Sequence, residues 1–106
     1  MTTIAEWQSR SGAWTDSRFP DDTIKDRGLI LGEETGEVLR CIVKAANDIR
    51  GGTEHWNAEL RKEAVDVFFT LVALAHRAGF DLEAQIEQEW PRINAIDYAD
   101  PTGKKS

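Results

Sequence analysis

The stretches GEETGE, residues 32–37, and EAVD, residues 63–66, decide how the chain is interpreted. In each stretch the acidic residues stand three or four positions apart, and on an α-helix this spacing places them on one side. Two such helices facing each other bring several carboxylates together, and these repel unless a cation lies among them. Oxygen-rich sites suit Mg²⁺ or Mn²⁺. The acids concerned are Glu33, Glu34, Glu37, Glu63 and Asp66.

Asp66 is the only charged residue in the run AVDVFFTLVALA, residues 64–75. A helix that is apolar on nearly every side is a buried helix. A lone ionised Asp in such a helix is costly unless it is paired or binds a metal. One interpretation is therefore a structural Asp at the rim of the core or in an ion pair with Arg40, Lys44 or Lys62. The two acidic motifs taken together favour a metal site.

The order E-E-x-x-E, a gap of about 25 residues and then E-x-x-D resembles the signature of the all-α nucleoside triphosphate pyrophosphohydrolases, the MazG-like superfamily. The segment LGEETGEVLRCIVKAANDIRGG is similar to the first motif helix of that family and the turn after it. The segment ELRKEAVDVFFTLVALAHRAGFDLE is similar to its second motif helix and the entry to the next helix. The resemblance covers roughly residues 19–98.

The resemblance implies that Glu34, Glu37, Glu63 and Asp66 are catalytic residues that hold Mg²⁺, with Mn²⁺ possible. It gives Glu33 an accessory catalytic role, either supporting the ligands or activating the attacking water. The implied reaction is hydrolysis of a nucleoside or deoxynucleoside triphosphate to the monophosphate and pyrophosphate, as a house-cleaning or nucleotide-pool activity. A phosphoribosyl-ATP or dUTP/dCTP-specific pyrophosphohydrolase of the same superfamily is one alternative. A non-catalytic helical dimerisation module with a solvated acidic face is another.

Cationic and aromatic residues supply candidates for substrate binding. Arg40 and Lys44 follow the first motif on the same helix and could pair with the acids or contact phosphates. Trp90 occupies a position where many relatives carry an aromatic residue or Met. Any of the four tryptophans could stack on a base, although packing is the commoner role for each. The substrate-binding candidates are Lys44, Arg40, Trp90, Arg92 and Asn94.

Two positions depart from the pattern of the family. Glu89 stands where relatives often carry a Lys, and Ile96 stands where they often carry an Arg before an acidic–aromatic pair. Arg92 or Lys44 could replace the missing cations. These departures bear on triphosphate specificity more than on metal binding.

Composition and charge narrow the class of protein. The chain has 106 residues, which predicts a single domain over residues 1–99 and a polar C-terminal tail over residues 100–106. The net charge of −6 argues against binding to nucleic acid or to an anionic membrane. One cysteine, Cys41, and no signal-peptide core suit a cytoplasmic protein.

The pattern of caps and apolar residues predicts helices over residues 2 to about 10, 22–48, 53–77 and from 82 onwards, with a loop at 13–20 and a turn at 50–52. Gly28, Gly32 and Gly36 form a stripe that suggests close approach of another helix or of a ligand. Pro91 predicts that the last helix kinks or stops near residue 89. The predicted fold is all-α, an antiparallel helical hairpin with flanking helices. It is four-helix-bundle-like and oligomeric, as a homodimer or a dimer of dimers that buries the apolar third helix.

Overall fold

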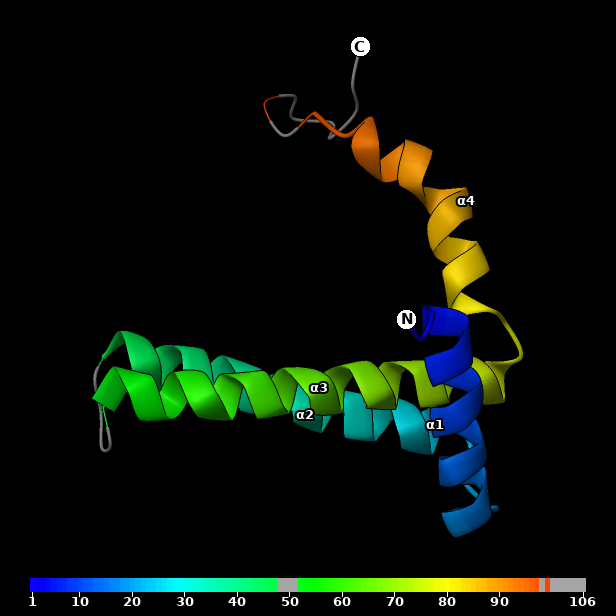
Figure 1. Ribbon diagram of the computed structural model, residues 1–106, viewed down its shortest axis with the longest axis horizontal. Helices are drawn as coiled ribbons and strands as arrows, with labels where there is room; N and C mark the ends of the chain where they lie inside the picture. The colour runs from blue at the N-terminus through cyan, green and yellow to red at the C-terminus, as the bar shows by residue number, and fades with distance from the viewer. Residues whose placement is uncertain (48–51, 98, 100–106) are drawn as a thin grey trace.

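The computed structural model describes residues 1–47, 52–97 and 99, and these residues form four helices and no strand. Helices α2 and α3 lie side by side as a long antiparallel hairpin, α1 crosses one end of it, and α4 leads away from that end (Figure 1). The predicted all-α fold built on a helical hairpin is confirmed. The helices span Ile4–Arg18 (α1), Ile24–Ala46 (α2), Gly52–Ala78 (α3) and Leu82–Asn94 (α4).

Short side-chain caps set several of the helix ends. Thr3 and Thr23 each begin a helix with a capping box, in which the Thr hydroxyl accepts from a backbone N–H and an acid three residues later binds back. Asp81 caps α4 by accepting from the backbone N–H of Ala84. Gly79 follows α3 with a φ of 84°, the left-handed conformation that a glycine adopts most readily after a helix.

The first helix is longer than predicted. It does not end at Gly12 but continues to Arg18, so the predicted loop over residues 13–20 is wrong for its first six residues. Gly12 is buried where α1 crosses α3, and a β-carbon at this position would collide with the ring of His76. The glycine therefore permits a close helix crossing instead of ending the helix. Ser11 adds a hydrogen bond to the carbonyl of Phe69 across the same contact, at 3.2 Å.

For the glycine stripe and for Pro91, the structure excludes one of the two alternatives that the sequence left open. Within the described chain, a β-carbon at Gly28, Gly32 or Gly36 would meet no atom within 4 Å, so no helix of this chain packs on the glycine stripe. Helix α4 does not stop at residue 89 but runs through Pro91 to Asn94. Proline has no N–H, and its ring crowds the carbonyl four residues earlier, but that carbonyl belongs to an exposed residue that water can reach.

The hairpin ends also differ slightly from the prediction. Helix α3 begins at Gly52, so Thr53 lies in its first turn, and its hydroxyl donates to the carbonyl of Ala45 on α2 at 3.2 Å. The predicted end of α2 at residue 48, part of the turn at 50–52, and the polar tail at 100–106 lie outside the described residues. None of the described helices combines the length and the apolar character that a membrane crossing requires.

A buried arginine joins the three helices that meet at the crossing. Arg27 on α2 is only 2% exposed, and it donates to Asp16 of α1 at 2.6 Å and to the carbonyl of Ala73 of α3 at 2.8 Å. Asp16 also accepts from Arg77 at 3.2 Å and lies 3.3 Å from the ring of His76. Removing one partner of a buried charge leaves the other uncompensated, so this network fixes where α1 sits on the hairpin.

The replacement Asp16→Asn tests this network. The hydrogen bond from Arg27 holds the pKa of Asp16 below its usual value, and the charges of Arg77, Arg27 and His76 add to the effect. A lowered folded-state pKa contributes stability above the unfolded-state pKa, and this contribution is lost as pH falls through the folded-state value. We therefore expect Asp16→Asn to lower the melting temperature near neutral pH and to lose less stability than the wild type on acidification.

Melting curves at about pH 7 and about pH 3 measure both effects. Asp21→Asn is the control, because Asp21 is an exposed acid in the α1–α2 connection. Equal melting temperatures for Asp16→Asn and the wild type near neutral pH would contradict the proposed role of the network.

Candidate active site

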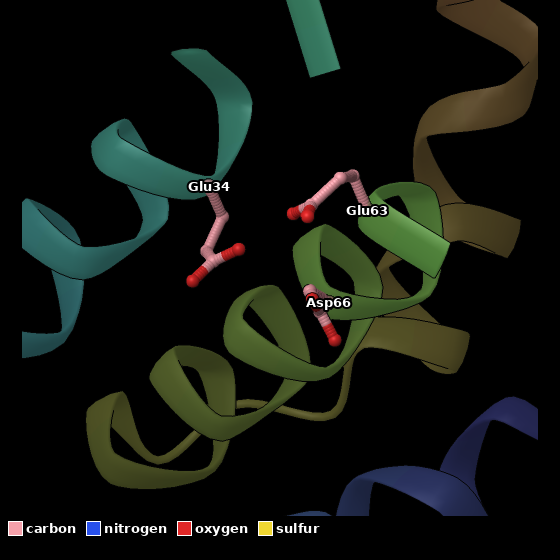
Figure 2. Close-up of side chains that lie close together, drawn as sticks. All are labelled: Glu34, Glu63 and Asp66. Carbon is pink, nitrogen blue, oxygen red and sulfur yellow. The ribbon is translucent and has the colours of Figure 1, made fainter. Parts of the chain in front are cut away.

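Three of the predicted acids converge across the hairpin. Glu34 extends from α2, while Glu63 and Asp66 extend from α3 one turn apart, and the three side chains lie near one another (Figure 2). One carboxylate oxygen from each of the three lies within 4.8 Å of the others. The antiparallel hairpin produces this cluster because it sets the middle of α2 against the middle of α3.

The cluster is electrostatically unfavourable without a cation. Burial raises the pKa of Glu34, and the neighbouring carboxylates of Asp66 and Glu63 and, more weakly, of Glu37 raise it further. Glu63 has a cationic neighbour: its side chain is only 12% exposed, and the ammonium of Lys62 lies 3.4 Å from its carboxylate. Repulsion of this kind is relieved when a divalent cation binds between the carboxylates.

The structure leaves Asp66 without the structural ion pair that was one interpretation of its sequence. In the described chain, Asp66 forms no salt bridge with a lysine, arginine or histidine. Arg40 pairs with Glu37, and Lys62 pairs with Glu63. The carboxylate of Asp66 instead lies beside those of Glu34 and Glu63, and the charges of Asp66 and Lys62 interact only weakly.

Glu33 and Glu37 lie outside the three-acid cluster. Both are exposed on α2, and Glu37 lies 3.4 Å from Arg40 in an exposed pair one turn apart. Glu37 is still close enough for its charge to raise the pKa of Glu34. The structure thus brings together three of the four predicted metal ligands and sets the fourth beside them.

A cleft of about 610 Å³ lies between α1 and the hairpin and includes Glu34 and Asp66 in its wall. Most of the wall is apolar, with aromatic rings contributed by both α1 and α3. Pockets of this size and character hold small molecules of about the size of a nucleotide. The aromatic side chains that line it are Trp7, Trp14, Phe19 and Phe69.

The predicted substrate-binding residues are not part of this cleft wall. Arg40 and Lys44 lie over the ring of Trp56, at 5.5 Å and 4.9 Å from its centroid, further along the hairpin. The other candidates, Trp90, Arg92 and Asn94, stand in the last turns of α4, which leads away from the hairpin (Figure 1).

Charge pairing also limits Arg92, one of the two residues proposed to replace the cations that this chain lacks. The Nε atom of Arg92 lies 2.6 Å from a carboxylate oxygen of Glu89, so its charge is already matched within α4. The hydrogen bond from Arg92 lowers the pKa of Glu89, which keeps that acid ionised. Arg92 is therefore a less available phosphate ligand than the sequence suggested.

The cleft wall contains residues that the sequence reasoning missed. Arg10, Arg27 and Phe69 line it, and none of them was a candidate. Trp7, Arg10 and Trp14 are spaced three and four apart, so a continuous helix through Gly12 would have placed all three on one face. The prediction that α1 ends near residue 10 hid this spacing.

One comparison with known proteins identifies the family. The family model of the MazG nucleotide pyrophosphohydrolase domain matches residues 23–93, a range that contains the whole hairpin and the three converging acids. No curated protein and no solved structure matches the chain. Because the match covers more than half of the sequence and the acids of its two motifs meet in space, the chain belongs to the MazG nucleotide pyrophosphohydrolase domain family.

Proposed function

We propose that the protein hydrolyses a nucleoside or deoxynucleoside triphosphate to the monophosphate and pyrophosphate, using Mg²⁺ or, in its place, Mn²⁺. The observation that carries the proposal is the cluster of Glu34, Glu63 and Asp66 in contact with a nucleotide-sized cleft. Membership of the family supports a nucleotide pyrophosphohydrolase in general. The metal, the triphosphate and the products are the parts that the proposal adds.

The donor set fits a hard divalent cation. All three converging groups are carboxylates, and the cluster contains no imidazole or thiolate that would favour a softer metal. The raised pKa of Glu34 fits the same conclusion, because a bound cation would favour its ionised form. Bound Mg²⁺ supplies charge neutralisation for phosphate oxygens and lowers the pKa of a water that it binds.

Glu37 completes the proposed ligand set. Its pair with Arg40 is exposed and lies within one helix, and such pairs contribute little to stability. Glu37 can therefore turn towards a cation beside Glu34 at low cost. Glu33, which is exposed on the same helix, keeps its proposed accessory role in supporting the ligands or activating the attacking water.

The apolar part of the cleft offers the place for the nucleoside. Trp7 and Phe69 meet edge to face with centroids 5.6 Å apart, and Trp14 lines the same wall. Aromatic faces stack on any base, which supports nucleotide binding but does not select among bases. The same site also serves the dUTP/dCTP-specific and phosphoribosyl-ATP alternatives, which differ in the group held beside the triphosphate.

The protein is proposed to act in the cytoplasm, where its nucleotide substrates are found, and to assemble as a homodimer or a dimer of dimers. Large apolar side chains remain exposed on one copy, among them Val65 at 49% and Trp90 at 57%. Exposed apolar residues spread over α2, α3 and α4 are what an assembly would cover. A second copy could also place cations from its own α4 near the site, which α4 of the same chain does not reach.

Release of pyrophosphate tests the activity. We expect the purified protein to release pyrophosphate from at least one member of a panel of nucleoside and deoxynucleoside triphosphates when Mg²⁺ is present. Excess EDTA should abolish the release, and added Mg²⁺ or Mn²⁺ should restore it, because the acids cannot neutralise phosphate charge by themselves. Full activity in EDTA, or no release from any nucleotide, would contradict the proposal.

Sedimentation tests the assembly. At micromolar concentration we expect a species of at least twice the chain mass of 11.9 kDa. A single species at the monomer mass across the concentrations at which the protein is active would contradict it.

A further inference from the structure

The cleft that holds two of the acids is lined by two cationic side chains, one buried and hydrogen-bonded and the other exposed. Arg27 is buried and its two terminal nitrogens donate to Asp16 and to the carbonyl of Ala73. Arg10 lines the cleft from α1, and its side chain is exposed to solvent. Only the second of these is placed to accept a new partner from solvent.

Arg10 makes no hydrogen bond and no ion pair with any residue in the described part of the chain. The charge of Arg10 acts only weakly on the nearby acid Glu6, whose carboxylate accepts from Thr3 in the capping box at the start of α1. The guanidinium of Arg10 also lies over a cleft residue, with its central carbon 4.6 Å from the centroid of the Trp7 ring. A cation–π contact of this kind holds the group near the ring without using its N–H donors in hydrogen bonds.

We propose that Arg10 binds the phosphate groups of the substrate, as a phosphate-contacting residue supplied by α1. This inference rests on the proposed function, since it names a further residue of the same site. A triphosphate carries more negative charge than one divalent cation neutralises, so the cleft needs a second source of positive charge. Planar guanidinium groups bind phosphate oxygens with two parallel hydrogen bonds.

The other cations near the acids each lie beside an acid of their own helix. Lys62 lies 3.4 Å from Glu63, and Arg40 lies 3.4 Å from Glu37 in an exposed pair that separates at low cost, so Arg10 adds to these charges. The family match begins at residue 23, so the cation proposed here comes from a helix outside the matched range.

Binding of inorganic tripolyphosphate with Mg²⁺ tests the proposal without a base, a sugar or turnover. We expect Arg10→Gln to weaken tripolyphosphate binding about tenfold, the usual effect of losing a charge-assisted hydrogen-bonded contact. Arg10→Lys keeps the charge but loses the planar guanidinium, so its tripolyphosphate affinity should lie between those of the wild type and Arg10→Gln. Isothermal titration calorimetry with the wild type and both variants measures these affinities.

Arg18→Gln is the matched control. Arg18 stands on the same helix and stacks on Trp14 in the same way, at 4.2 Å, but it does not line the cleft. We expect its tripolyphosphate affinity to stay within about twofold of the wild type. Arg10 and Arg18 are both exposed, so melting curves of the two variants should remain close to that of the wild type.

The outcomes separate this inference from the proposed function. If the wild type releases pyrophosphate and Arg10→Gln binds tripolyphosphate as the wild type does, the inference about Arg10 is wrong and the function stands. If no nucleotide is hydrolysed but Arg10→Gln alone loses tripolyphosphate binding, Arg10 remains a polyphosphate ligand and the proposed reaction is wrong. A wild type that binds no tripolyphosphate in the presence of Mg²⁺ overturns the inference.

Discussion

Repulsion among like charges is the constraint around which this small domain is arranged. The hairpin of α2 and α3 sets Glu34 against Glu63 and Asp66, and burial together with these neighbours raises the pKa of Glu34. An apolar helix does not gain stability by holding a carboxylate such as Asp66 beside two others. The arrangement is explained if the folded protein binds a cation there, because the free energy of binding then offsets the repulsion.

The position of α1 places a cleft beside the acidic cluster. Arg27 and Asp16 fix α1 across the hairpin, and Gly12 lets it approach α3 closely. The aromatic face of α1 then closes one side of the cleft and brings Arg10 to it. The buried ion network and the acidic cluster thus have separate tasks: one holds the wall in place and the other supplies the negative charge that a metal ion requires.

Sequence reasoning predicted the hairpin and its acids because both depend on local spacing. The acidic spacings of residues 32–37 and 63–66 and the apolar run around Asp66 each carry their own signal within a few residues. The role of Gly12 was missed because a glycine ends a helix as readily as it permits a close crossing, and only tertiary contact distinguishes the two. Arg27 was missed because burial of an arginine depends on partners from two other helices.

Melting of the wild type and of Asp66→Asn, each with and without Mg²⁺, tests the central claim most directly. The account predicts that the metal-free variant melts at or slightly above the wild type, because repulsion falls, and that Mg²⁺ stabilises the wild type much more than the variant. Glu87→Gln removes an exposed acid of α4 and should keep the full response to Mg²⁺. A large loss of stability in metal-free Asp66→Asn, or an undiminished response to Mg²⁺, would contradict the account.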